Sequence, residues 1–350
     1  MTVGPAPGNT IPPRIRVANV SKLFGGDRAE ARRLIGEGLD KVEILGRTGC
    51  TIAVNDVSFD VAAGEIFVVM GLSGSGKSTL VRCLNRLHSP DAGRVEIDGE
   101  DICAADDDRL RSLRLEKITM VFQNFALLPH RTVAENAEYG LKMRGMAPAA
   151  RREKAHQALE AVGLSPWSDR LPSDLSGGMQ QRVGLARALA LDPEILLMDE
   201  PFGALDPLIR QDMQHELLEL QARHRTTIIF ITHDLNEALT LGDRVAVMKD
   251  GRFSQVGTPS EIVLSPADDY VSAFTRDIDR ARILPVSCAL RGSTAENMDA
   301  LPEVHADALL ASVLGRLGQG PLRVTGRDGN LKGIVTAADA AAIAAPPGKG

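Results

Sequence analysis

One short segment constrains the fold of this chain more than any other. An apolar run, Ile66–Met70, leads directly into Gly71-Leu-Ser-Gly-Ser-Gly-Lys77-Ser78. This segment fits the pattern G-x-x-x-x-G-K-[ST], in which glycines let backbone N–H groups turn towards phosphate oxygens. The apolar run predicts a buried strand, and a helix is expected to begin near Lys77, with its positive N-terminal end facing the same phosphates. The order strand, loop, helix predicts an α/β domain that binds a nucleoside triphosphate.

Two side chains of this loop have expected roles of their own. Lys77 is expected to contact the β and γ phosphates, and the hydroxyl of Ser78 is expected to bind Mg²⁺. ATPases, GTPases and kinases share such loops, and a chance glycine-rich turn is the remaining alternative, so the loop alone does not name the reaction. The nucleotide-binding residues expected from this segment are Gly71, Ser73, Gly74, Ser75, Gly76, Lys77, Ser78 and Thr79.

A pair of acidic residues, Asp199 and Glu200, ends a second apolar run, Ile195–Met198. Ligands of open α/β sheets bind at the carboxyl ends of the parallel strands, where this pair is expected to lie. Asp199 is expected to hold Mg²⁺ through its water shell, and Glu200 to orient or deprotonate the attacking water. Taken alone, two acids fit the start of a surface loop equally well. Together with the phosphate loop, they favour hydrolysis of a nucleotide.

A third segment, Leu175-Ser-Gly-Gly-Met-Gln-Gln-Arg182, decides between these classes. Ser176 is the expected N-cap of a helix, and two glycines allow a phosphate to approach the backbone closely. The segment resembles the signature of ATP-binding-cassette (ABC) ATPases. That resemblance implies a homodimer in which the signature contacts the γ-phosphate of ATP held by the opposite protomer. The residues carried over are Ser176, Gly177, Gly178 and Gln180.

Other landmarks of the same family follow in order between residues 14 and 265. Gln123 matches the glutamine that senses the γ-phosphate and Mg²⁺, Asp206 lies in the loop that crosses the dimer interface, and His233 matches the switch histidine. The resemblance implies ATP and Mg²⁺ as cofactors, with Ser78, Gln123 and Asp199 at the metal. It implies Glu200, His233, Lys77 and Gln123 as the catalytic residues.

The family usually stacks an aromatic residue on the adenine, and Phe24 is the expected residue here. It lies 47 residues before Gly71 (71 − 24), which is longer than the usual interval. A helical insertion at about 27–48 accounts for the difference. Packing of Phe24 against this insertion is the alternative.

Several strings resemble one subfamily, the ATPase subunits of glycine betaine, proline and choline importers: Gly36–Leu39, Met70–Gly76, Phe122–His130 and Phe202–Arg210. The resemblance implies a peripheral subunit at the cytoplasmic face of the inner membrane. It implies a transmembrane permease that docks on the Phe125–Thr132 region, and an extracytoplasmic substrate-binding protein. Another ABC importer of amino acids or small solutes, and a non-transport ABC ATPase, are the alternatives.

The expected architecture is α/β: a P-loop NTPase (ABC ATPase) core with an antiparallel β subdomain and a helical subdomain, and then a small α+β module. The pattern predicts helices over Val133–Met143, Pro148–Val162, Gly177–Leu191 and Val304–Leu317. The C-terminal module resembles an incomplete cystathionine-β-synthase (CBS) domain, which implies either regulation or dimerisation. The expected ranges are a disordered lead-in at 1–13, the ATPase domain at 14–275 with its helical subdomain at about 132–191, and the module at 276–345.

Composition excludes several other classes. The net charge is −6 and aromatic residues make up 3%, which disfavours a nucleic-acid partner. The four cysteines form no C-x-x-C pair, so neither a zinc site nor a disulfide framework is expected. No apolar run approaches the roughly 20 residues that a membrane span needs. If the protein serves a membrane, another chain is expected to cross it.

Overall fold

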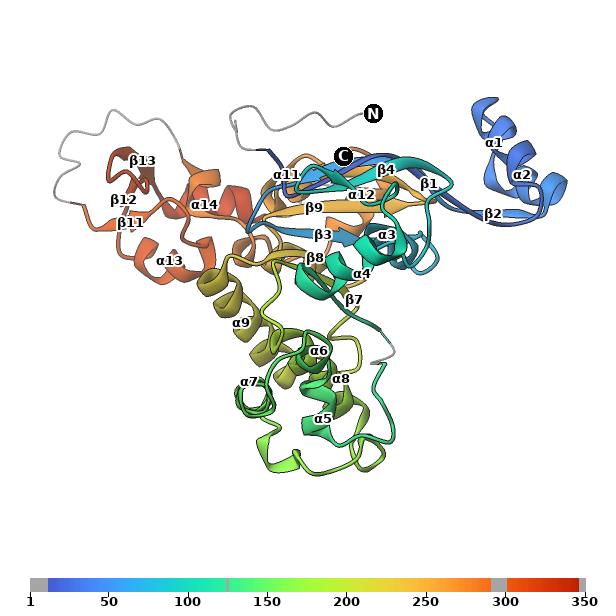
Figure 1. The fold of residues 1–350 in the computed structure, drawn as a ribbon. Coiled ribbons are helices and arrows are strands. Elements are labelled where there is room, and N and C mark those ends of the chain that lie inside the picture. The colour runs from blue at the N-terminus through green and yellow to red at the C-terminus, as the bar shows by residue number, and fades with distance from the viewer. Residues whose placement is uncertain (1–11, 124–125, 291–300, 346–350) are drawn as a thin grey trace. The chain divides into compact units, whose positions relative to one another are not determined.

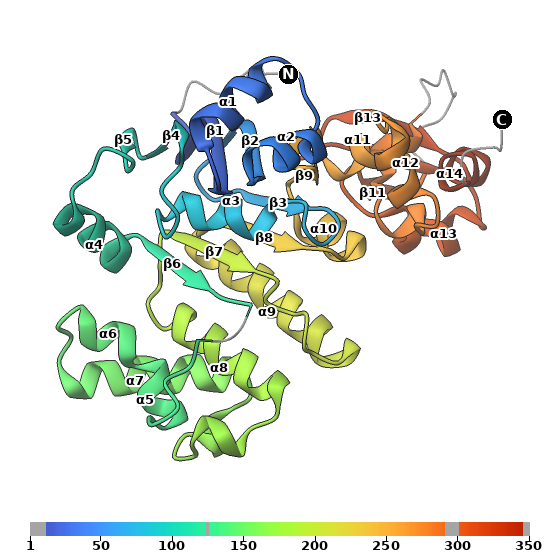
Figure 2. The ribbon, with the colours of Figure 1, turned by 90° about the vertical axis from the view of Figure 1, so that its right-hand side faces the viewer.

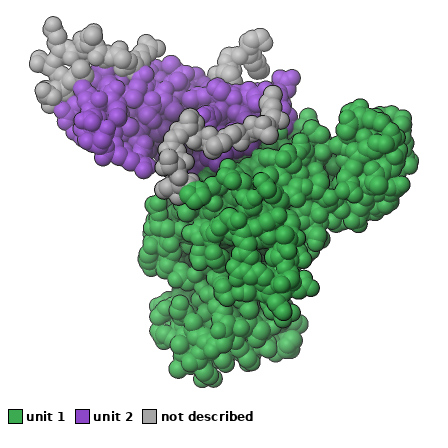
Figure 3. Space-filling view, turned by 45° about the horizontal axis from the view of Figure 1, so that its top comes forward, with its two compact units in different colours: residues 1–234, 246–253 green, residues 235–245, 254–350 purple. Residues whose placement is uncertain are grey.

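The computed structural model describes residues 12–123, 126–290 and 301–345. It divides into two compact units (Figure 3). The first takes in the chain up to Asp234 together with Ala246–Phe253, and the second takes in Leu235–Val245 and the chain from Ser254 onwards. The second unit thus begins earlier than the boundary near residue 275 that the sequence pattern suggests.

A six-stranded sheet forms the centre of the fold (Figures 1 and 2). Strands β3, β8, β7 and β6 pair in parallel, and every residue of β3, β7 and β8 is buried. Continuous apolar runs suit strands that are covered on both faces. The sheet confirms the strands predicted at Ile66–Met70 and Ile195–Met198. Its order is β10 (Arg252–Gly257), β9 (Arg244–Lys249), β3 (Ile66–Met70), β8 (Thr227–Thr232), β7 (Ile195–Asp199) and β6 (Ile118–Val121).

The strand register brings the carboxyl ends of three central strands to one edge. Met70 is opposite Thr232, and Asp199 is opposite Ile231. The segments that follow these strands are the glycine-rich loop, the Glu200 loop and the His233 segment. The topology therefore gathers motifs from three distant parts of the chain at one edge of the sheet.

A second, antiparallel sheet has the order β2 (Cys50–Val61), β1 (Ile15–Gly25), β4 (Ala92–Ile97) and β5 (Glu100–Asp101). The β1–β2 ribbon carries two helices at one end, α1 (Arg28–Gly36) and α2 (Lys41–Thr48) (Figure 1). Asp27 and Asp40 cap these helices through their side chains. The helices are held to the ribbon by an apolar cluster of Leu23, Ala31, Leu34, Ile44, Cys50 and Ile52.

The remaining helices of the first unit include α3, which follows the glycine-rich loop, and α8, which Ser176 caps as predicted. The stretch predicted as one helix at Val133–Met143 is divided into α5 and α6. The bounds are α3 (Lys77–Leu84), α4 (Asp107–Glu116), α5 (Val133–Ala137), α6 (Tyr139–Met143), α7 (Pro148–Ala161), η1 (Ser165–Trp167), η2 (Pro172–Asp174), α8 (Gly177–Leu189) and α9 (Pro207–His224).

In the second unit, a three-stranded sheet has the order β11–β12–β13, and the helices α13 and α14 lie beside it (Figures 1 and 2). The prediction of one helix over Val304–Leu317 was wrong at its start, because Glu303–His305 pairs in parallel with β12. The bounds are α10 (Leu235–Leu241), α11 (Pro259–Leu264), α12 (Asp269–Thr275), η3 (Arg280–Arg282), η4 (Val286–Ala289), β11 (Glu303–His305), α13 (Leu310–Leu317), β12 (Leu322–Thr325), β13 (Leu331–Val335) and α14 (Ala337–Ala344). Within the described ranges, none of the helices has the length and apolar character needed to cross a membrane.

Candidate active site

The glycine-rich loop lies tightly against one strand of each of the two sheets of the first unit. Gly71, Gly74 and Gly76 have φ angles of 152°, 80° and 107°, a backbone region that favours glycine. A Cβ atom at Gly76 would lie 2.0 Å from the carbonyl oxygen of Ala53, and one at Gly71 would lie 2.2 Å from that of Met248. Side chains at these two positions would therefore push the loop away from β2 and β9.

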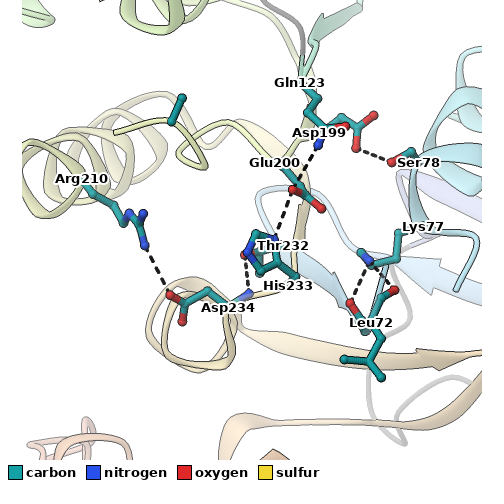
Figure 4. A network of polar contacts seen from close by, with 12 residues as sticks. Leu72, Lys77, Ser78, Gln123, Asp199, Glu200, Arg210, Thr232, His233 and Asp234 are labelled. Carbon is teal, nitrogen blue, oxygen red and sulfur yellow. Dashed lines mark hydrogen bonds and ion pairs between the residues drawn. The ribbon is translucent and has the colours of Figure 1, made fainter. Parts of the chain in front are cut away.

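Lys77 and Ser78, the first residues of α3, lie directly after this loop (Figure 4). Lys77 is buried, and its Nζ donates hydrogen bonds to the carbonyl oxygens of Gly71 at 2.8 Å and Leu72 at 3.0 Å. Burial lowers the pKa of the Lys77 ammonium, while Glu200 and Asp199 oppose that shift. The ammonium group thus lies over the loop that the sequence predicts to hold phosphates.

Asp199 ends β7 with a side chain that is fully buried. Its Oδ1 accepts a hydrogen bond of 2.7 Å from the hydroxyl of Ser78, and its Oδ2 lies 3.5 Å from a guanidinium nitrogen of Arg82. Burial raises the pKa of the Asp199 carboxyl, and the Ser78 hydroxyl and the Arg82 charge counteract this. The pair predicted to hold a metal is thus already in contact across the edge of the sheet.

Glu200 brings two other predicted residues together (Figure 4). Its Oε2 accepts a hydrogen bond of 3.3 Å from Nε2 of Gln123 and lies 3.2 Å from Nδ1 of His233. The Glu200 side chain is 18% exposed and that of His233 is 59% exposed, so the cluster opens to solvent on the histidine side. A carboxylate placed in this way has access to a water molecule and to a proton partner.

The signature segment makes a different set of contacts. Ser176 accepts a hydrogen bond from the backbone N–H of Met179, and the Gln180 amide donates to the carbonyl oxygens of Pro172 and Leu175. Asp206 caps α9 by accepting from the N–H of Ile209. Within one chain, these predicted residues are therefore engaged with their own helices and loops, rather than with the glycine-rich loop.

Phe24, near the end of β1, lies opposite Thr51 of β2. Its ring packs edge-to-face with His88 at 5.3 Å between centroids, and the ammonium of Lys22 is 5.3 Å from the Phe24 centroid. Lys22 also pairs with Asp91 at 3.2 Å. These contacts tie the aromatic ring to the segment that follows α3, whereas the neighbouring Leu23 enters the apolar cluster of the insertion.

Three residues of this region escaped the sequence reasoning: Arg82, Gln181 and Arg210. Arg82 lies one helical turn after Ser78, and that spacing is a signal that points to a shared face of α3. Arg210 donates to the carbonyl oxygen of Leu205 at 3.2 Å and pairs with Asp234 at 3.4 Å. Gln181 contacts the Glu200 loop, which no local sequence pattern indicates.

The fold and this site define an ATP-binding-cassette ATPase, an enzyme that binds and hydrolyses ATP. Residues 54–203 match the family described as ABC transporter. The chain belongs to the ATP-binding proteins of ABC transporters, since long alignments at about half identity connect it with them.

Three relatives illustrate this membership. The chain is 49% identical over 329 residues to the glycine betaine transport ATP-binding protein OpuAA of Bacillus subtilis, covering 94% of this chain and 78% of that protein. It is 53% identical over 280 residues to the glycine betaine/proline betaine protein ProV of Salmonella typhimurium, covering 80% and 70%. It is 51% identical over 272 residues to the trimethylamine N-oxide protein TmoW of Ruegeria pomeroyi, covering 78% and 80%.

A solved structure supports the fold. The dimeric structure of MJ0796, a bacterial ABC transporter cassette, aligns with a TM-score of 0.62 and 34% identity. The alignment covers 70% of this chain and 98% of that one. A second structure of the same cassette, in a post-hydrolysis state bound to ADP and phosphate, aligns with the same TM-score.

Proposed function

We propose that this chain is the ATP-hydrolysing subunit of an importer for osmolytes of the glycine betaine, proline and choline type. The relatives named for glycine betaine and trimethylamine N-oxide transport support this class of solute. The observation that carries the catalytic part is the meeting of Gln123, Glu200 and His233 at the sheet edge that also holds Lys77 and Asp199.

The phosphates of ATP are proposed to lie in the loop Gly71–Thr79. Its backbone N–H groups and the N-terminus of α3 favour anions, and Lys77 would transfer its hydrogen bonds from the loop carbonyls to the β and γ phosphates. The adenine is proposed to stack on Phe24. The Phe24 ring is held in place by His88 and Lys22, which both contact it.

The residues at the sheet edge fit Mg²⁺. A hydroxyl and a carboxylate are ligands that this ion prefers, and no described residue donates a hydrogen bond to the buried Oδ2 of Asp199. Ser78 and Gln123 are proposed as direct ligands, and Asp199 would hold the water shell. When bound, the ion neutralises charge that develops on the phosphates.

Glu200 is proposed to orient and deprotonate the attacking water, since its carboxylate contacts His233, on whose side the cluster opens to solvent. His233 contacts the same oxygen and would turn to the γ-phosphate when ATP is bound. Gln123 would follow the γ-phosphate and the metal in the same way. These moves use side chains that already share one acceptor atom in this structure.

A homodimer is proposed to complete each site. The dimeric arrangement of the similar cassette supports it, as does Gly177 at the start of α8, where an added Cβ atom would meet nothing within 4 Å. Ser176, Gly177, Gly178 and Gln180 of one protomer would face the γ-phosphate bound by the other, and Asp206 would lie at the interface. Two ATP molecules would thus close the dimer, and hydrolysis would reopen it.

The permease is proposed to dock on a groove of about 340 Å³. The groove lies between β6 and the helices α4, α6 and α8, and its lining is mostly apolar. Phe125, the first residue of the docking region predicted at Phe125–Thr132, lies outside the described residues. The described residues that line the groove include Leu128 of the predicted docking region, and Met120, Phe122, Tyr139 and Met143 outside it.

The remaining partners follow from the importer class. The subunit is proposed to lie at the cytoplasmic face of the inner membrane, as a peripheral protein, with an extracytoplasmic binding protein delivering the solute to the permease.

The C-terminal segment 276–345 is proposed as a CBS-like regulatory module. Its β11–α13–β12–β13–α14 order supports a single α+β repeat.

The test of the catalytic assignment is Glu200→Gln. The variant is expected to bind ATP with unchanged affinity and to lose most turnover, because the amide cannot accept the proton of water. It is also expected to elute as an ATP-dependent dimer in size-exclusion chromatography. Retention of turnover close to that of the wild type would remove Glu200 from this role.

A further inference from the structure

Gln181 bridges two parts of the chain that act at the active site. It lies on α8 with 3% of its surface exposed. Its Nε2 donates a hydrogen bond of 3.3 Å to the backbone carbonyl of Glu200, and its Oε1 accepts one of 3.2 Å from the backbone N–H of Ala204. One buried amide therefore ties the signature helix to both ends of the loop that begins with the catalytic carboxylate.

The backbone of Glu200 needs such support. Its φ angle is +48°, a left-handed conformation that is strained for a residue with a side chain. The Glu200 N–H donates to Ile231 in the neighbouring strand, and its carbonyl also accepts from Gly203 within the same turn. Gln181 supplies the hydrogen bond from outside this turn. Without this bond, the strained backbone of Glu200 could relax, and the Glu200 carboxylate would shift.

The signature also contacts this loop at a second point. A Cβ atom at Gly178 would lie 3.4 Å from both the carbonyl oxygen of Ala204 and a methyl carbon of Leu205. Arg210 then joins Leu205 to Asp234, the residue after His233. The loop from Glu200 to Leu205 is therefore held between the start of the signature helix and the segment that carries His233.

We infer that Gln181 is a positioning residue for hydrolysis, which couples the signature helix to the catalytic carboxylate of the same chain. In the proposed dimer the signature contacts the partner's ATP, so this inference rests on the proposed function. The ATP held by the partner would set the position of α8. Through its hydrogen bond, Gln181 would then make the position of Glu200, which acts on the ATP of its own chain, depend on the position of α8. Gln180 has a different environment, since its amide donates to the carbonyl oxygens of Pro172 and Leu175, just before α8.

The first experiment compares Gln181→Met with Gln221→Met in the full-length chain. Methionine keeps the length of the side chain and removes its hydrogen bonds. Because the Glu200 carbonyl loses one of its two donors and the Ala204 N–H loses its acceptor, kcat of Gln181→Met is expected to fall about tenfold or more. The KM for ATP and the ATP-dependent dimer are expected to persist, because no nucleotide contact is removed.

Gln221→Met is the matched control. The Gln221 amide on α9 donates to the carbonyl oxygen of Gly64, away from Glu200. Its loss is expected to lower the thermal midpoint and leave kcat unchanged. Wild-type kcat in Gln181→Met, an equal kcat loss in the control, or a parallel rise in KM would overturn the inference.

A second variant covers a failure of Gln181→Met to fold. In Gln181→Glu the carboxylate still accepts from Ala204 but has no N–H to donate to Glu200. The loop therefore keeps one anchor, so the same loss of kcat is expected. Because a buried carboxylate is costly, the thermal midpoint should fall, and kcat is measured well below that midpoint. Full activity of this variant would contradict the role of Gln181.

Heterodimers purified through two different tags locate the effect. Wild type paired with Glu200→Gln hydrolyses at one site only. Adding Gln181→Met to the chain with intact Glu200 is expected to lower that activity by the same factor of about ten or more, whereas adding it to the Glu200→Gln chain is expected to preserve it. The reverse pattern would show that Gln181 acts through nucleotide contact and overturn the inference. Absence of activity in the first heterodimer would contradict the proposed dimer instead, and the kcat comparison would still decide the role of Gln181.

Discussion

Arg82 faces Asp199 from one helical turn beyond Ser78, with 3.5 Å between a guanidinium nitrogen and the carboxylate Oδ2. The Asp199 side chain is fully buried, while that of Arg82 is 38% exposed. A buried carboxylate is costly unless a charge or hydrogen bonds compensate it, and α3 supplies both through Arg82 and Ser78. The helix that begins at the phosphate loop therefore also stabilises the acidic residue on the neighbouring strand.

Ser78 and Arg82 offset only part of the cost of burying Asp199, because the pKa of its carboxyl is still raised. We therefore predict that Asp199 lowers the stability of the nucleotide-free protein near neutral pH. Burial raises the pKa of Asp199, so the folded state holds a proton there more readily than the unfolded chain. Stability falls as the pH rises from the ordinary carboxyl pKa through the raised pKa, and the full penalty is present above the raised pKa. Asp199→Asn is therefore expected to raise the midpoint of thermal unfolding by roughly 2–4 °C per kcal/mol removed. Calorimetry without nucleotide measures this.

The gain should shrink as the pH falls towards the ordinary pKa of a carboxyl group, because wild-type Asp199 then becomes protonated. Glu43→Gln, at an exposed carboxylate on α2, is the control and is expected to leave the midpoint unchanged. A gain that grows on acidification would contradict the interpretation. ATPase activity of Asp199→Asn is expected to be lost throughout, since the carboxylate near the proposed metal is gone.

Complementation tests whether the sites are shared between protomers. Lys77→Ala is expected to weaken ATP binding at its own loop, and Ser176→Arg is expected to block the signature with a bulky side chain. A mixed dimer would contain one site with both defects and one intact site. Part of the ATPase activity should therefore return on mixing the two inactive variants. No recovery, despite heterodimers shown by dual-tag purification, would argue against composite sites.

Replacement of Phe24 tests the adenine contact. Loss of a stacking partner costs about 1–3 kcal/mol per base, so Phe24→Ala is expected to raise the KM for ATP roughly fivefold to more than a hundredfold. Phe24→Tyr should stay close to the wild type. Inhibition by inorganic tripolyphosphate is the control, and it should be unaffected because it needs no base. A variant with unchanged KM and lower thermal stability would instead indicate that Phe24 is a packing residue.

The proposed docking groove makes a separate prediction. Met143 lines it and is 46% exposed. Met143→Glu places a charge in an apolar lining, so stimulation of ATPase activity by the reconstituted permease should fall while basal activity persists. Val42→Glu, at a residue of α2 that is 79% exposed, is the matched control. Equal stimulation of both variants would exclude Met143 from the docking surface.

The sequence was most informative where the physical signal is local. Continuous apolar runs predicted β3 and β7, and the glycine pattern predicted the start of α3 at Lys77. The sequence was less informative where pairing with a distant strand decides whether a segment is a strand or a helix. Val304 belongs to a strand because β12 pairs with it, although the apolar spacing that follows is helical.

The candidate site shows the same division. Gln123, Glu200 and His233 were expected together because each falls at a recognisable motif, and the structure places them around one oxygen atom. Gln181 and Arg82 were not identified. Their contacts are with Glu200 and Asp199, which are distant in sequence, so only the packing of α8 and α3 against the sheet edge shows them.

Truncation tests the proposed regulatory module. Every residue of the candidate site lies in the first unit, so deletion of residues 276–350 is expected to preserve basal ATPase activity. The response of transport to salt should change if charges of the module contact an anionic membrane, because the Debye length falls from about 10 Å at 0.1 M to about 3 Å at 1 M. Several arginines here already have partners: Arg282 pairs with Asp279, Arg323 with Glu303 and Arg327 with Asp307. The effect should therefore be moderate.

The measurement is transport in anionic liposomes containing the permease, scanned over ionic strength for the full-length and truncated proteins. Arg323→Gln separates a membrane contact from simple loss of the module, because it changes a charge while its neighbours in β12 stay paired. It also releases Glu303, which keeps a hydrogen bond from Thr325. If the truncated protein and the Arg323→Gln variant both shift the salt curve in the same direction from that of the full-length wild type, a charge-based sensor is supported. Superimposable curves for the full-length and truncated proteins would show that the module is not the sensor, which leaves a dimerisation role or an evolutionary remnant as the interpretation.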